Sequence, residues 1–171
     1  MTVKIIIADS CSLILLWKCG ALERLADSSK LIVPPKVYNE IVNENTLQIY
    51  PDAKNIHDLV KADKIAIEKP SAGAADIPIT LGAGETECIQ LYTTRNADVI
   101  LTDDGKAIKV CRYLGIPFTI SPKVVVSLFE GGRISFEHAR TAILKLEKIG
   151  RYARDIIADA LLCLQSRRDE P

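Results

Sequence analysis

The 171-residue sequence carries no excess charge of either sign, since 22 Lys and Arg residues balance 22 Asp and Glu residues. Proteins that bind nucleic acid through a broad basic surface have a clear excess of Lys and Arg, so this class is excluded. Aromatic residues make up only 5% of the chain, which excludes a stacking platform for single strands. No uncharged apolar stretch approaches the ~18 residues that a membrane span needs, so we expect no membrane association.

Histidine is scarce and cysteine is scattered. The two histidines, His57 and His138, have no further ligand at a suitable spacing, which disfavours a zinc site. The five cysteines form no CxxC pair and are odd in number, so we expect reduced thiols in a cytoplasmic protein. The apolar run at the start of the chain meets Asp9 at once and is too short for a secretory signal.

Short apolar runs alternate along the chain with longer segments of helical periodicity. We expect strands at residues 3–8, 31–33, 65–67, 99–101 and 117–120, and helices at residues 12–26, 36–42, 52–61, 85–94 and 107–114. A further apolar run covers residues 124–129 and ends at two glycines. Residues 69–84, which contain Gly, Pro and small side chains, are expected to form the longest loop. The alternation predicts an α/β fold with a central, mainly parallel sheet of about five strands.

The end of the chain follows a different pattern. Two amphipathic stripes flank Gly150, which predicts an αα-hairpin with one apolar face. We therefore expect the main domain to span residues 1–132 and the helical hairpin to span residues 133–171. The hairpin must bury its apolar face against the same domain or against another subunit.

Acidic residues recur where the predicted chain direction would bring them to one edge of the sheet. Asp9 follows the first strand, Asp103 and Asp104 follow the fourth, Glu40 lies on the helix after the second, and Glu85 opens a helix. Like charges within ~4–6 Å oppose each other's ionisation, so such a set favours a bound cation. Oxygen-only ligands indicate Mg²⁺ or Mn²⁺, and such ions suit phosphoryl chemistry.

Each of these acids also has a purely structural explanation. Asp9 suits a helix cap, Glu40 a solvated helix face, and Glu85 the positive end of a helix dipole. The pair Asp103 and Asp104 suits a turn followed by a helix cap, and we favour one turn residue and one ligand.

Other functional classes fit the sequence less well. Gly82 and Gly84 match the first two glycines of a dinucleotide fingerprint, but the third position is Glu87. The chain has no GxSxG motif, and no DxDx[TV] motif of the phosphatase type follows the first strand.

Four segments, in this order, resemble the PIN-domain endoribonucleases, and within them the short VapC-like toxins. They are IIADSCSLI at residues 6–14, VPPKVYNEI at 33–41, LGAGETECIQLY at 81–92 and ILTDDGKA at 100–107. The resemblance covers about residues 3–132 and implies a three-layer α/β/α domain. It implies that four acids hold Mg²⁺ or Mn²⁺, namely Asp9, Glu40, Glu85 and Asp104. Asp103 is an alternative to Asp104 as the fourth ligand, and Glu87 is implied to be an outer ligand.

The resemblance also implies partners. An RNA substrate is expected, and the residues expected to bind it are Lys106, Lys109, Arg112 and Arg95. A homodimer is implied as well and, if the chain is the toxin of a toxin–antitoxin pair, a cognate antitoxin that blocks the site.

Two positions depart from the family pattern. Cys11 stands where relatives commonly have Ser or Thr, and Ile108 stands where relatives often have Arg. Ser10 or Ser12 is available to replace the missing hydroxyl. The departures leave open an alternative, a catalytically weak or inactive PIN-like module that binds nucleic acid or protein.

Overall fold

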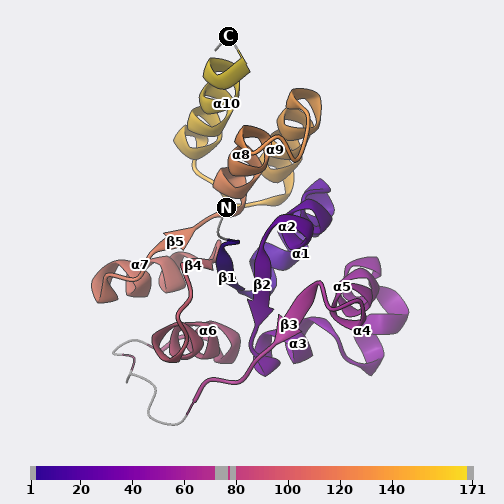
Figure 1. The fold of residues 1–171 in the computed structure, drawn as a ribbon, viewed down its shortest axis with the longest axis vertical. Helices are drawn as coiled ribbons and strands as arrows, with labels where there is room; N and C mark the ends of the chain where they lie inside the picture. The colour runs from indigo at the N-terminus through magenta and orange to yellow at the C-terminus, as the bar shows by residue number, and fades with distance from the viewer. Residues whose placement is uncertain (1–2, 72–76, 78–79, 169–171) are drawn as a thin grey trace.

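One parallel sheet organises the chain (Figure 1). The computed structural model describes residues 3–71, 77 and 80–168. The strand order is β3-β2-β1-β4-β5, with every neighbouring pair parallel. The strands are β1 (Ile5–Ala8), β2 (Lys30–Val33), β3 (Ile65–Ile67), β4 (Val99–Leu101) and β5 (Phe118–Thr119). The predicted α/β class with five parallel strands is confirmed.

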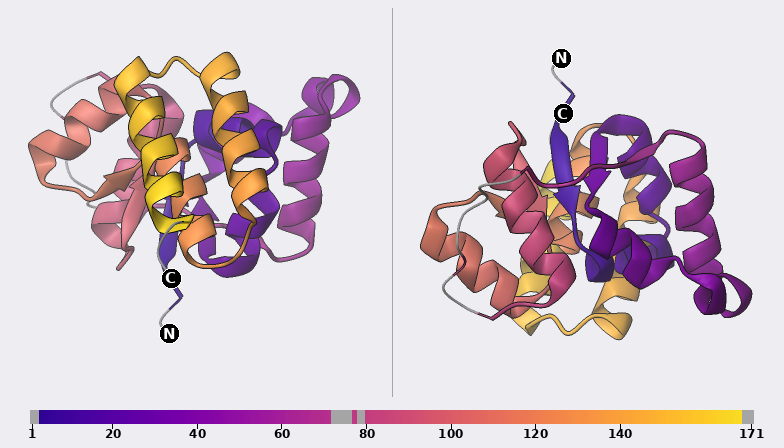
Figure 2. Two further views of the ribbon diagram at one scale, coloured as in Figure 1. Left: turned by 90° about the horizontal axis from the view of Figure 1, so that it is seen from above. Right: turned by 90° about the horizontal axis from the view of Figure 1, so that it is seen from below.

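Helices cover both faces of the sheet. The first five are α1 (Ser10–Cys19), α2 (Leu22–Ser28), α3 (Pro35–Ile41), α4 (Glu44–Ile49) and α5 (Pro51–Lys61). The others are α6 (Ala83–Thr94), α7 (Gly105–Leu114), α8 (Ser121–Glu130), α9 (Phe136–Ile149) and α10 (Arg154–Arg168). Helix α6 packs on β1 and β4 on one side, and α9 and α10 lie on the other side (Figure 2). Both faces of β1 are therefore enclosed, as its β-branched sequence requires.

The predicted helix at residues 12–26 is wrong, because the structure has two helices there. Gly20 adopts φ +83° after α1 and donates its N–H to the carbonyl of Trp17 at 2.9 Å. This left-handed conformation ends a helix and is readily adopted only by glycine. The first of the two helices begins at Ser10, two residues before the predicted start, because Asp9 is its N-cap.

Two further boundaries differ from the predictions. Helix α4 was not expected; Asn43 caps it and exchanges hydrogen bonds with Thr46 in a capping box. Part of the predicted loop at residues 69–84, namely 72–76 and 78–79, lies outside the described residues. Helix α6 begins at Ala83, inside the predicted loop.

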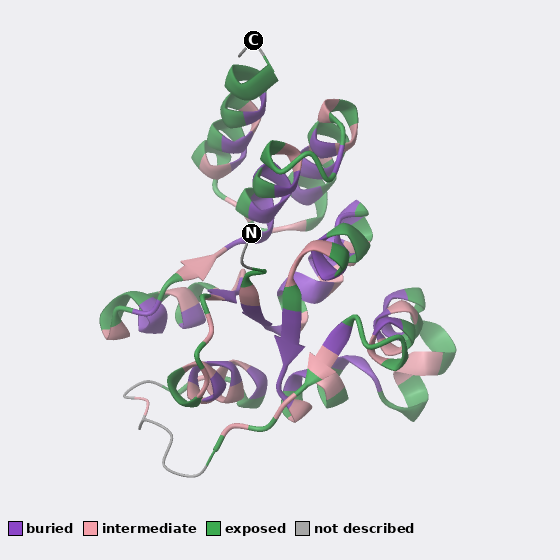
Figure 3. Ribbon diagram, in the orientation of Figure 1, coloured by how far each residue is buried: buried purple, intermediate pink, exposed green. Residues whose placement is uncertain are grey.

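The predicted hairpin is present as α9 and α10. Helix α9 packs against α1 and α8, and α10 packs against α8 and α9. The middle of the apolar stripe of α9, which includes Ala139, Ile143 and Leu146, is fully buried, whereas Ile149 at its end is exposed (Figure 3). A boundary between two parts at residue 132 remains a prediction. No helix in the described ranges is both long and apolar enough to span a membrane.

Candidate metal centre

The sheet order changes direction between β1 and β4. The chain builds β1, β2 and β3 outward to one side, then returns to place β4 on the other side of β1. In open parallel sheets, ligands bind at such a switch point, beyond the carboxyl ends of the strands. Asp9 follows β1 at this point, and Thr102, Asp103 and Asp104 follow β4.

Asp9 is the buried centre of this edge, with 1% of its surface exposed. Its Oδ1 accepts a hydrogen bond from the Ser12 N–H at 2.8 Å, and its Oδ2 accepts one from Thr102 Oγ1 at 2.5 Å. Burial raises the pKa of Asp9 to about 6, although these hydrogen bonds oppose the rise, and the charge of Asp103 adds to it. The carboxylate is thus held rigidly in an apolar setting that disfavours its charge.

Glu40 reaches the same edge from α3. Its Oε1 accepts a hydrogen bond from the Gly84 N–H at 3.1 Å, and its Oε2 accepts one from Ser10 Oγ at 2.9 Å. Gly84 lies in the first turn of α6, where backbone N–H groups have no partner within the helix. Glu40 therefore joins the first turns of α1 and α6.

Glu87 makes the reverse connection. It lies on α6, and its Oε2 accepts a hydrogen bond from the Lys36 N–H at 2.9 Å, in the first turn of α3. Helices α3 and α6 thus each supply a carboxylate to the N-terminus of the other. Glu87, which resemblance makes an outer ligand, has a helix-capping role in the structure.

Asp103 and Asp104 have different surroundings. Asp104 is the N-cap of α7, and its Oδ1 accepts hydrogen bonds from Lys106 N at 2.9 Å and Ala107 N at 2.8 Å. Asp103 instead accepts hydrogen bonds from Ser121 and from Tyr152. Of the two, Asp104 has a carboxylate oxygen, Oδ2, to which no hydrogen bond is found among the described residues.

The thiol of Cys11 indicates how closely the acids gather. Its pKa is raised to about 11, chiefly by burial and then by the negative charges of Asp9, Asp103, Asp104 and Glu85. These four carboxylates are therefore all close enough to the first turn of α1 to act on this thiol.

The thiol of Cys88 also lies near these acids. It donates a weak hydrogen bond to the Ala8 carbonyl at 3.5 Å. Burial raises its pKa well above the ordinary value, and the charges of Asp9, Glu85 and Glu40 raise it further. The other four predicted acids thus lie on the same side of the sheet edge as Asp9.

The donor chemistry of this edge fits a hard cation. Within residues 3–71, 77 and 80–168, no three His, Cys, Asp or Glu side chains are already arranged to hold one ion. The acids nevertheless supply only oxygen donors, the type that Mg²⁺ and Mn²⁺ prefer. Ser12 Oγ is buried beside Asp9 and makes no well-formed hydrogen bond to a described residue. A buried carboxylate and an unsatisfied hydroxyl at one place are consistent with a bound ion and its water.

The basic residues predicted to grip RNA do not all reach this edge. Lys106 and Lys109 are exposed on α7, the helix that Asp104 caps. Arg95 follows the last residue of α6, at the opposite end from the acids, and pairs with Glu68 at 2.9 Å. The structure therefore does not bring Arg95 to the acids.

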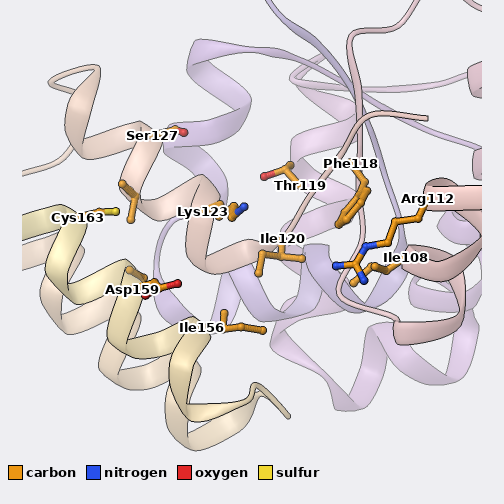
Figure 4. Close-up of a pocket in the computed structure, with 12 residues that line it drawn as sticks. Ile108, Arg112, Phe118, Thr119, Ile120, Lys123, Ser127, Ile156, Asp159 and Cys163 are labelled. Carbon is orange, nitrogen blue, oxygen red and sulfur yellow. The ribbon is translucent and has the colours of Figure 1, made fainter. Parts of the chain in front are cut away.

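Arg112 faces a groove of about 500 Å³ between α7, β5, α8 and α10 (Figure 4). Its guanidinium lies 5.6 Å from the centre of the Phe118 ring, a cation–π contact. Ile108 also lines this groove. The departure from the family pattern at residue 108 therefore changes a wall of the groove.

Four polar residues around the acids were missed by the sequence analysis or given no firm role. Ser12 and Thr102 fix Asp9, and Thr102 stands directly before the predicted pair of acids, which is a usable signal. Ser121 and Tyr152 lie 18 and 49 residues from Asp103, and no local pattern connects them to it.

Replacing Asp104 tests its structural role separately from any chemistry. Asp104→Ala removes two hydrogen bonds to the first turn of α7, and we expect a loss of about 1 kcal/mol in the free energy of unfolding. Asp104→Ser restores a capping oxygen and is expected to recover most of that loss. Urea unfolding of both variants measures the difference; equal stabilities would contradict the capping role.

A model of the PIN-domain family matches residues 5–166 of the chain. The chain therefore belongs to the PIN-domain family, and its all-parallel sheet with flanking helices is the three-layer fold that resemblance implied. A search of curated proteins returned no match. PIN domains are generally nucleases, which bind nucleic acid and typically use divalent metal ions. A nuclease-type function follows for this chain.

Proposed function

We propose that this PIN domain is an endoribonuclease that hydrolyses RNA phosphodiester bonds with Mg²⁺ or Mn²⁺. The observation that carries the proposal is the gathering of carboxylates around the buried Asp9 at the switch point between β1 and β4. Among the described residues, none of these carboxylates forms an ion pair with Lys, Arg or His. A cation would offset their mutual repulsion. The proposed ligands are Asp9, Glu40, Glu85 and Asp104.

A bound ion would supply an activated water and would neutralise charge on the phosphate. The chain's own residues prepare the site. Thr102 and Ser12 hold the Asp9 carboxylate in one orientation, and Ser10 holds that of Glu40. Above about pH 6, Asp9 loses its proton and becomes a negatively charged ligand.

Substrate binding is assigned to α7. Lys106 and Lys109 are exposed on the helix that begins at Asp104, so they would meet the phosphates of a strand lying across the acids. The resemblance of the four segments supports a finer proposal, that the chain is a VapC-like toxin, forms a homodimer and is inhibited by an antitoxin.

One observation favours a second candidate, a PIN-like binding module without catalysis. Both carboxylate oxygens of Asp9 and of Glu40 already accept hydrogen bonds within the protein. If these bonds satisfy the acids, no metal binds and RNA or protein binding is metal-independent. Isothermal titration with MnCl₂ separates the two candidates, because only the nuclease binds the ion.

The direct test is cleavage of single-stranded RNA by the full chain. We expect cleavage with Mn²⁺, loss of cleavage in EDTA, and recovery when excess Mn²⁺ is restored. Asp9→Asn is expected to lower the rate by at least about 100-fold. Asp58→Asn, which makes the same change at an exposed position on α5, is the matched control and is expected to cleave normally. Equal rates for Asp9→Asn and the unaltered chain would overturn the proposal.

A further inference from the structure

We propose that Tyr152, in the connection between α9 and α10, is a positioning residue for metal binding at the acid site and acts through Asp103. The inference rests on the proposed function. It gives the C-terminal hairpin a part in the site. Tyr152 lies outside the four segments that carry the resemblance.

Asp103 is held by three hydrogen bonds from two distant parts of the chain. Its Oδ1 accepts from Ser121 N at 3.0 Å and from Tyr152 Oη at 2.7 Å, and its Oδ2 accepts from Ser121 Oγ at 2.5 Å. Ser121 is the first residue of α8. Because both carboxylate oxygens are bound, Asp103 has one fixed orientation.

This anchoring matters because Asp103 lies in the chain between Thr102 and Asp104. Thr102 donates a hydrogen bond to Asp9 and accepts one from the Asp104 N–H at 3.2 Å. A shift of the backbone at Asp103 would therefore move Thr102, which orients Asp9, and Asp104 itself. Partners that orient metal-binding carboxylates have large effects on metal affinity.

The connection between α9 and α10 leaves space for the ring of Tyr152. Gly150 has φ −91°, which any residue can adopt, so its φ angle does not require glycine. A Cβ at this position would instead collide with Cε2 of Tyr152, and would lie 2.6 Å from Cδ2 and 2.9 Å from the backbone carbonyl oxygen of Leu146. Glycine at 150 thus leaves the space that the ring occupies, an observation independent of the hydrogen bonds.

The test measures Mn²⁺ binding to the full chain by isothermal titration, without RNA. Tyr152→Phe removes one hydrogen bond to Asp103 and is expected to weaken Mn²⁺ binding about tenfold. Gly150→Ala displaces the same ring and also crowds the Leu146 carbonyl oxygen, so it is expected to weaken Mn²⁺ binding by at least as much. Tyr113→Phe is the matched control, because Tyr113 is 74% exposed, and it is expected to bind Mn²⁺ normally.

A double-variant cycle shows whether Tyr152 acts through Asp103. In an Asp103→Ala background, which has no side-chain acceptor for the Tyr152 hydroxyl, adding Tyr152→Phe is expected to change the Mn²⁺ dissociation constant no further. An additional tenfold loss in that background would overturn the route through Asp103. Thermal melts accompany each titration, because a purely structural tyrosine would lower the melting temperature and leave Mn²⁺ affinity unchanged, which would also overturn the inference.

The two proposals fail in different ways. If the unaltered chain neither binds Mn²⁺ nor cleaves RNA, the proposed function and the role of Tyr152 are both wrong. If the unaltered chain binds Mn²⁺, Asp9→Asn abolishes binding and Tyr152→Phe leaves it intact, only the inference about Tyr152 is wrong.

Discussion

Asp9→Asn is expected to abolish RNA cleavage while making the metal-free protein more stable at neutral pH. The variant keeps the fold because Asn caps helices as well as Asp does. Its amide oxygen would accept the Ser12 N–H, and its amide nitrogen would donate to Thr102 Oγ1. What disappears is a buried negative charge that the folded protein accommodates poorly without a cation.

The pH dependence follows from the raised pKa of Asp9. Folding raises this pKa from 3.8 to about 6, so the folded protein binds more protons than the unfolded chain in that range. The resulting stability is fully present below about pH 4 and is lost as the pH rises through 6. The loss at pH 7 is up to about 3 kcal/mol, and Asn does not suffer it.

Urea unfolding in EDTA at pH 4 and pH 8 measures the effect. We expect Asp9→Asn to exceed the unaltered chain in stability by about 1 to 3 kcal/mol at pH 8, and by much less at pH 4. Adding Mn²⁺ is expected to stabilise only the unaltered chain, because a ligand stabilises the state that binds it. If Asp9→Asn were less stable than the unaltered chain at pH 8, the hydrogen bonds accepted by the Asp9 carboxylate would contribute more to stability than the burial of its charge costs.

Gly84→Ala is expected to reduce cleavage by about 10- to 100-fold with little effect on stability. A Cβ at residue 84 would lie 2.8 Å from both carboxylate oxygens of Glu40, so the Glu40 side chain must move. That movement weakens the hydrogen bonds that Glu40 accepts from Gly84 N–H and Ser10 Oγ, and the better helix propensity of Ala offsets much of this loss. Displacement of a catalytic group by about 1 Å can cost 100-fold in rate.

The matched control for Gly84→Ala is Gly105→Ala. Gly105 begins α7 at the same edge of the sheet, and a Cβ there would meet nothing within 4 Å. Cleavage rates with Mn²⁺ and thermal melts of both variants make the comparison. Normal cleavage by Gly84→Ala, with its melting temperature preserved, would show that the position of Glu40 is not needed.

The sequence was sufficient to predict the sheet because its strands are short and apolar, and its central strands are rich in β-branched residues and largely buried. The same runs end in acids, so the gathering of Asp9 and Asp103 follows once the strands are parallel. Local rules failed where glycine ended a helix, at Gly20, and where an arginine lay at the far end of a helix, at Arg95.

The connections within the site had no local signal. Glu40 and Gly84 are 44 residues apart, and Asp103 and Tyr152 are 49 residues apart. Hydrophobic periodicity predicts which face of a helix is buried, but it does not specify which backbone N–H a glutamate will reach. Such pairings depend on how the helices pack, which becomes visible only in three dimensions.

The mutual capping of α3 and α6 has a consequence for how the site can open. Glu40 and Glu87 tie the two helices together at their N-termini, so neither can swing away without freeing backbone N–H groups on both. Separation of these helices would therefore break both hydrogen bonds. A binding partner that separated α3 from α6 would remove Glu40 from the site while leaving Asp9 in place.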